Sequence, residues 1–433
     1  MNEHAVTVGE TTIVGRPELV CPEGMLRLGS ICPEGGVMSL ALQRATTARE
    51  AIAIIGELVE AHGYYQPMWH GEHLSISDGK EVWAFAIFGP GDEWTPGSGK
   101  PGAVWCARCI RDGHVGFSAN RSRIGEIDPN DLIRFLCSPN VCFLAEERGW
   151  WDPSSGNPFI WYEAYAPNDM TYCSLREWRV QSELAPSLNL DPNEERFPFS
   201  VKPDAPVAVQ DVMNLHRDHY QGTAYDITED PMFQVGGQPS PLTYPYYSYG
   251  QDALQELLNA SPRRTLAVRS LFSYVAQVRE GAPSPVKGCL WYGQGPASTT
   301  CYVPVDSGVT ALPELWGTTL MTKIDWETAF WAFDLVHELA HIRWQDAYLD
   351  IDAVRTAAEQ TFFNDQPTFE QHVASLLLFQ GETAAREAAT DYTSSRMGAV
   401  LDGYWELVDY LLFKHYFLAS AAIPQPLPAI IVP

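Results

Sequence analysis

The sequence has few basic residues. It contains 28 Lys and Arg against 54 Asp and Glu in 433 residues, which gives a formal net charge of −26. Binding to the phosphate backbone requires clustered Lys and Arg that displace counterions. We therefore expect no nucleic acid among the partners of this chain, and no attraction to anionic membrane surfaces.

Long apolar runs are also lacking. No stretch of about 18 apolar residues is long enough for a membrane-spanning helix. The start, Met1-Asn2-Glu3-His4, has neither the basic segment nor the apolar stretch of a signal peptide. We expect a protein without membrane segments and with a cytoplasmic location.

The cysteines do not form a disulfide pattern. There are nine, an odd number spread over a long chain, unlike the dense, even spacing of a secreted disulfide scaffold. Cys106 and Cys109 form a CxxC, but "GAVWCARCI" reads as a strand, in which residues three apart point to opposite faces. They make poor co-ligands, and we predict mostly free thiols, no metal and no cofactor.

What remains is typical of a globular α+β protein, with 45% hydrophobic and 12% aromatic residues. Residues 37–60 carry apolar positions at helical spacing, with Gly63 as a stop. Two pairs of apolar runs surround Asp78-Gly79 and Asp112-Gly113, dipeptides suited to tight hairpins. The run Val82–Phe88 is apolar on both faces, as expected of a sheet covered on both sides.

The second half of the chain begins with loops and ends with helices. Residues 150–260 are rich in Pro, Gly, Tyr and Asn and predict ordered loops, whereas strands return in residues 264–279 and 288–305. Residues 326–364 contain neither Gly nor Pro, which predicts one long helix. We expect residues 326–433 to be the helical C-terminal part of a single domain.

This long helix contains His337-Glu338-Leu339-Ala340-His341, the HExxH pattern of zinc peptidases. Histidines at i and i+4 share one helical face and can bind one ion, while the Glu activates water. A catalytic zinc needs a third ligand. The metzincin continuation, a Gly and a third His, is absent from the following "IRWQDAYLD".

Glu359 is the obvious third ligand, 18 residues after His341 (359 minus 341). If the helix is continuous, its rise separates the two by roughly 27 Å, too far for a shared ion. One alternative stays open: a reversal near Asn364–Pro367 would bring Glu387 or Asp391 opposite His341. The other reading is a polar stripe on a packed helix.

Six longer segments carry more information than HExxH through their order and spacing. They are "NEHAVTVGETT" (2–12), "LALQRATTAREAI" (40–52), "EVWAFAIFGPG" (81–91), "GAVWCARCIRDGHVGFSANRSRI" (102–124), "RSLFSYVAQVR" (269–279) and "PASTTCYVPVDSGVTALP" (296–313). These segments resemble the bacterial cysteine dipeptidases of the dipeptidase A type, which are related to the secernins and belong to the N-terminal-nucleophile hydrolases. The resemblance runs nearly end to end, and it implies a four-layer αββα sandwich.

The resemblance implies hydrolysis of dipeptides or short peptides by a cysteine whose own α-amino group is the general base. Side-chain amides then hold the oxyanion. Asn2 and Asn120 occupy the positions where the resemblance implies such donors. Arg269 is a candidate for steadying the nucleophile or a substrate carboxylate.

The expected nucleophile is not found in this sequence. The resemblance implies a nucleophile strand well upstream of "NEHAV", and the first cysteine, Cys21, follows twenty residues. We expect the catalytic Cys to lie upstream of Met1. Alternatives are a non-catalytic, peptide-binding family member and a zinc peptidase using residues 337–341. Whether copies of the chain form a homo-oligomer is left open.

Overall fold

The computed structural model describes residues 1–433 except residues 21–35, 66–69, 93, 168–170, 242–269, 418–425 and 433. The described chain divides into two compact units, residues 1–207 and 208–433. Both units combine helices with antiparallel strands, which confirms the α+β class. Within the described residues, no helix is long and apolar enough to cross a membrane.

The first unit is built on a five-stranded antiparallel sheet with the order β1-β2-β3-β4-β6. The hairpin expected at Asp78 is confirmed, since Ser77 pairs with Val82 and the Asp78 carboxylate accepts the backbone N–H groups of Lys80 and Glu81. The strands are β1 (Thr7–Val14), β2 (His70–Ser77), β3 (Val82–Phe88), β4 (Val104–Ile110) and β6 (Phe135–Cys137).

Both faces of this sheet are covered, as the apolar pattern of β3 predicts. Trp83 and Phe85 belong to one buried cluster with α1 (Val37–Leu42) and α2 (Ala48–His62). Phe88, on the other face, belongs to a second cluster with α3 (Phe143–Glu147) and α4 (Trp161–Tyr165). Period-two alternation thus sends successive side chains into two different cores.

The same alternation separates the CxxC thiols. Cys106 is buried in the second cluster, whereas Cys109 packs against the first. Cys106 instead lies opposite Cys137 of β6, with 3.2 Å between the two Sγ atoms. The expectation that Cys106 and Cys109 point to opposite faces is confirmed.

Two local predictions for this unit were wrong. The helix expected over residues 37–60 is two helices, because Thr47 takes an extended conformation and its side chain caps the backbone N–H of Glu50. Asp112-Gly113 forms a turn but not a hairpin, since the strand after it, β5 (Val115–Gly116), pairs with β7 (Ser200–Val201). Gly63 does end α2, with a positive φ of 84°.

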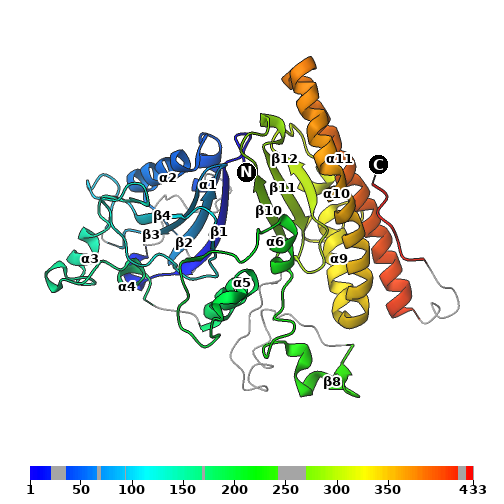
Figure 1. The fold of residues 1–433 in the computed structure, drawn as a ribbon, viewed down its shortest axis with the longest axis horizontal. Helices are drawn as coiled ribbons and strands as arrows, with labels where there is room; N and C mark the ends of the chain where they lie inside the picture. The colour runs from blue at the N-terminus through cyan, green and yellow to red at the C-terminus, as the bar shows by residue number, and fades with distance from the viewer. Residues whose placement is uncertain are drawn as a thin grey trace. The chain divides into compact units, whose positions relative to one another are not determined.

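The second unit packs helices on a three-stranded antiparallel sheet of order β10-β11-β12. Figure 1 shows α9, α10 and α11 beside these strands. The strands are β10 (Phe272–Val278), β11 (Gly288–Gln294) and β12 (Val303–Asp306), and the helices are α6 (Val209–His216), α9 (Ala329–Ile342), α10 (Trp344–Gln380) and α11 (Glu382–Leu411).

The prediction of a single helix over residues 326–364 was also wrong. The helix breaks at Arg343, which has φ −140° and ψ 57°. Contacts with α11 and with the turn that follows it (Leu412–Tyr416) show that the chain reverses at Arg343. Along α9, Phe333 contacts Tyr404 and Leu339 contacts Tyr416, so the partner numbers increase. Along α10, Asp350 contacts Lys414 and Asp365 contacts Arg396, so the partner numbers decrease.

Candidate functional site

Asn2 ties the start of the chain to the end of α1. Its Nδ2 atom donates hydrogen bonds to the carbonyl oxygens of Leu42 (2.9 Å) and Ala45 (2.7 Å). Its Oδ1 atom accepts from the backbone N–H groups of His4 and Val6, both at 3.0 Å. Both amide hydrogens are engaged, so Asn2 has to release one of them before it can bind an oxyanion.

Asn120 lies in a loop after β5 with a left-handed backbone, φ 58°. Its Nδ2 atom donates to the carbonyl of Thr12 in β1 at 2.9 Å, and its Oδ1 atom accepts from Arg176 at 3.1 Å. Asn tolerates this backbone region better than most residues. The two bonds fix the amide plane and leave its second hydrogen without an acceptor among the described residues.

A buried ionic cluster lies next to Asn120 in the sequence and joins its loop to α5 (Thr171–Leu184). Arg123 pairs with Glu177 at 2.5 Å, and Arg121 lies 3.5 Å from the same oxygen. Arg123 also donates to the carbonyl oxygens of Phe197 and Pro198. These charges are costly to bury and are stable only as a bonded group, so the cluster holds this loop in one conformation.

Arg123 also lines a pocket of about 290 Å³ on the sheet face opposite α1 and α2. Its polar walls come from β2 and from the loop that contains Asn120. The pocket is lined by His73, Ser75, Val82, Ala84, Ile110, His114, Val115, Gly116, Phe117, Ser118, Arg123 and Phe199.

His73 is the unusual group in this pocket. It is 3% exposed, and its Nδ1 atom has no hydrogen-bond partner within the described chain. Burial, and then the charge of Arg123, lowers the pKa of His73 to about 4. The imidazole is therefore neutral at neutral pH, and its Nδ1 atom can bond to a ligand. A buried, unpartnered polar atom costs free energy that a ligand would recover.

Six of the seven described cysteines do not have the properties of a catalytic thiol. A nucleophilic cysteine needs a lowered pKa. Burial instead raises the pKa of Cys173 to about 11 and raises that of Cys106 well above its ordinary value. Burial also raises the pKa of Cys109, Cys142, Cys289 and Cys301.

The HExxH residues lie on α9. His337 is fully buried, and its Nδ1 atom bonds to the Thr299 hydroxyl at 3.0 Å. His341 Nδ1 lies 3.3 Å from Glu338. In the described part of the chain, no group of three His, Cys, Asp or Glu side chains is placed to hold a metal ion.

The proposed third ligands lie elsewhere. Glu359 is on α10 after the reversal, so the distance argument from a continuous helix was wrong, but its carboxylate is bonded to Arg217 (2.5 Å) and to the Tyr302 N–H (2.9 Å). The alternative that the sequence left open, a reversal near Asn364–Pro367, does not occur. The helix continues through Pro367 and turns at Gly381.

As a result, Glu387 and Asp391 do not return opposite His341. Tyr404 of α11 stacks on Phe333 with 3.9 Å between ring centroids, two turns before His341. Asp391 precedes Tyr404 by 13 residues (404 minus 391), roughly 20 Å along a helix. The open alternative, in which one of these two carboxylates lies opposite His341, is therefore excluded.

Of the three predicted site residues, the structure places Asn2 and Asn120 at opposite ends of β1, and Arg269 lies outside the described residues. Sequence reasoning missed His73, Arg123 and Glu177. Arg123 stands in the same "SANRSRI" segment as Asn120. That segment could have pointed to Arg123. Nothing in the sequence, however, indicates that Arg123 pairs with Glu177, 54 residues later.

The model of peptidase family C69 matches residues 1–357, and the chain belongs to that family. This confirms the predicted family resemblance.

Three curated relatives show the range of similarity. The chain is 28% identical over 306 residues to a probable dipeptidase of Salmonella dublin, covering 69% of this chain and 60% of the relative. It is 25% identical over 332 residues to a probable dipeptidase of Latilactobacillus sakei (76% and 62%). It is 23% identical over 313 residues to dipeptidase A of Lactobacillus helveticus (71% and 57%). The chain thus spans about 60% of the length of these relatives.

Proposed function

We propose that this chain is the substrate-binding part of a cysteine dipeptidase. The pocket that contains His73 and Arg123 carries the proposal, because it offers an unpartnered neutral imidazole and a positive charge on one sheet face. The names of the curated relatives support dipeptides as the substrate class. A dipeptide's carboxylate would lie in the field of Arg123 and bond to His73 Nδ1.

In the proposed reaction, a thiolate attacks the peptide carbonyl and the C–N bond then breaks. The nucleophile is proposed to come from a segment outside these 433 residues, since burial raises the pKa of six described cysteines. Asn120 is the first candidate for stabilising the oxyanion, because it has a free amide hydrogen on a fixed plane. Asn2 is the second candidate, and Arg269 is retained as a substrate-carboxylate residue.

The proposal includes the finer fold of the family. The long helix α2 packs with α1 on one face of the first unit's sheet, and α9, α10 and α11 pack on the sheet of the second unit, which is compatible with the outer layers of an αββα sandwich. We propose that both units belong to one such N-terminal-nucleophile hydrolase domain. A cytoplasmic location and a homo-oligomer stay predictions.

Binding is tested first on the 433-residue chain. L-alanyl-L-alanine and its C-terminal amide are titrated by calorimetry, and the amide is expected to bind at least about tenfold more weakly. NMR of the imidazole should show a higher His73 pKa in the presence of the dipeptide, because the carboxylate stabilises the imidazolium. His73→Gln should weaken dipeptide binding, whereas the matched exposed variant His62→Gln should not.

Equal binding of dipeptide and amide, or an unchanged His73 pKa, would overturn the pocket assignment. Catalysis is tested separately by reading the DNA upstream of Met1 and expressing the extended chain. An in-frame Cys-bearing segment should give dipeptide hydrolysis that iodoacetamide abolishes and that Asn120→Ala lowers by about 100-fold. Saturable binding without hydrolysis by the extended chain would instead identify a non-catalytic peptide-binding protein.

A further inference from the structure

A second pocket in the first unit lies beyond the other end of the β3–β4 pair. It is about 370 Å³ in volume and shares no lining residue with the His73 pocket. Pro90 follows the Phe88 end of β3, whereas the His73 pocket includes Val82 at the start of that strand. Seven strand residues separate the two pockets by roughly 20 Å.

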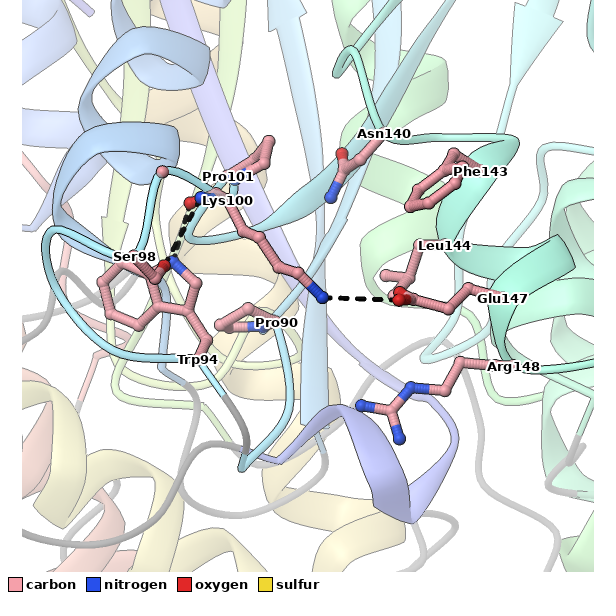
Figure 2. A pocket seen from close by; sticks show the side chains of 11 residues that line it. Pro90, Trp94, Ser98, Lys100, Pro101, Asn140, Phe143, Leu144, Glu147 and Arg148 are labelled. Carbon is pink, nitrogen blue, oxygen red and sulfur yellow. Dashed lines mark hydrogen bonds and ion pairs between the residues drawn. The ribbon is translucent and has the colours of Figure 1, made fainter.

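Apolar side chains line two sides of this pocket. Figure 2 shows Trp94, Pro90 and Pro101 of the β3–β4 loop on one side, with Phe143 and Leu144 of α3 on the other. The Trp94 ring is held in place, because its Nε1 atom donates to the Lys100 carbonyl at 2.9 Å. A rigid aromatic wall of this kind favours an aliphatic or aromatic group.

Both signs of charge are present on the same pocket. Lys100 reaches across to Glu147, with 3.4 Å between Nζ and Oε1, and Arg148 adds a second cation (Figure 2). The Lys100 and Glu147 side chains are 64% and 42% exposed. Such an exposed ion pair contributes little free energy, so a ligand that carries both charges can replace it without a large cost.

Asn140 gives the pocket a third polar group. Its Nδ2 atom donates to the Ala103 carbonyl at 3.2 Å, whereas its buried Oδ1 atom accepts no hydrogen bond from the described residues. The lining therefore combines cations, a carboxylate and an amide acceptor with apolar side chains. The volume lies at the small end of ligand pockets, which range over about 300–1,000 Å³.

We propose that this pocket binds a free, zwitterionic α-amino acid with an apolar side chain. Its carboxylate pairs with Lys100 and Arg148, and its ammonium group pairs with Glu147. Its side chain packs on Trp94 and Phe143. Free amino acids are the products of the proposed reaction, but the pocket's chemistry does not depend on that function.

The test is calorimetry on the whole chain with three probes: L-leucine, leucinamide, which lacks the carboxylate, and 4-methylpentanoate, which lacks the ammonium group. L-leucine should bind with a dissociation constant of about 1 mM or below. Each analogue should bind at least about tenfold more weakly than L-leucine, because each loses one charge contact.

Two variants make the test specific, and both replace exposed side chains. Lys100→Met should weaken L-leucine and 4-methylpentanoate but not leucinamide. Glu147→Gln should weaken L-leucine and leucinamide but not 4-methylpentanoate. The control Lys80→Met, at the β2–β3 turn, should change none of the three. No L-leucine binding at about 10 mM, or equal effects of both variants on all probes, would overturn the proposal.

The outcome is separable from that of the proposed function. Dipeptide binding near His73 should be unchanged in Lys100→Met and Glu147→Gln, because the two pockets share no lining residue. Loss of L-leucine binding in Phe143→Ala, with the fold intact by circular dichroism, would show that the apolar side chains of the pocket take part.

Discussion

Glu177 and Arg123 form an ion pair with 2.5 Å between Oε2 and Nη1, in which the side chains are 0% and 3% exposed. A buried pair of this kind adds little net stability, but removing one partner leaves an uncompensated charge. Since Arg121 approaches the same carboxylate, Glu177 compensates two guanidinium groups. It therefore fixes the loop that holds Asn120.

We expect Glu177→Gln to lower the free energy of unfolding by about 3–5 kcal/mol. The control is Glu183→Gln on the same helix, whose partner is Arg179 but whose side chain is 46% exposed. That variant should lose no more than about 1 kcal/mol. Urea denaturation measures both values. Equal losses of unfolding free energy would show that the buried cluster stabilises the fold no more than an exposed ion pair does.

The left-handed backbone of Asn120 predicts an inverted order of stability for two variants. Asn120→Ala loses the hydrogen bonds to Thr12 and Arg176 and also places an alanine at φ 58°. An alanine in this left-handed region costs about 1–2 kcal/mol. Asn120→Gly loses only the bonds. The glycine variant should therefore be the more stable of the two by about 1 kcal/mol.

Glu57, an exposed position of α2, serves as the control for the relative stability of alanine and glycine variants in an ordinary helix. There the alanine variant should be more stable than the glycine variant by about 1 kcal/mol. Thermal and urea unfolding of the four variants give the comparison. If Asn120 showed the same order as Glu57, its backbone would not be strained.

Two helical glycines differ in the space around them. A Cβ added at Gly56 in α2 would lie 2.5 Å from the Trp105 ring, whereas one added at Gly398 in α11 would meet no atom within 4 Å. Gly398→Ala should stabilise its unit by about 0.5–1 kcal/mol. Gly56→Ala should destabilise by about 1–3 kcal/mol, because the packed indole has to move.

Hydrogen exchange read by mass spectrometry reports the two units separately. Protection should rise around α11 in Gly398→Ala and fall around α2 and β4 in Gly56→Ala. Increased protection from exchange in both variants would mean that the Trp105 ring moves away from the new methyl group at little cost in free energy.

The sequence predicted what local patterns control. Asp78-Gly79 sets its hairpin through bonds within four residues, and the uninterrupted apolar run of β3 predicted that both faces of the sheet are covered. The break before α2 also had a local signal, since Thr47 and Glu50 have the capping-box spacing.

Long-range contacts were not predictable in this way. Glu177 and Arg123 are 54 residues apart, and no sequence pattern joins them. The reversal at Arg343 needs neither Gly nor Pro, because packing of α9 and α10 on α11 directs it. Pro367 suggested a break where the structure has none, since a helix can lose one hydrogen bond and continue.

Asp306, in β12 of the second unit, predicts a pH dependence of stability. Burial raises the pKa of Asp306 to about 7, although Gln366 donates a hydrogen bond to its carboxylate. In the unfolded chain the pKa returns to about 3.9. Between these values the folded state holds a proton that the unfolded state has lost, so stability falls as pH rises from about 4 to about 7 and then levels off.

Asp306→Asn removes this titration and keeps an oxygen for Gln366. The variant should therefore be more stable than the original chain at pH 8, and its advantage should shrink towards pH 4. His216 acts in the opposite sense, since burial lowers its pKa to about 4, but its contribution cancels in the difference between two chains that both contain it. Urea denaturation at pH 4 to 8 gives that difference. A difference that does not change with pH would mean that Asp306 has the same pKa in the folded and unfolded states.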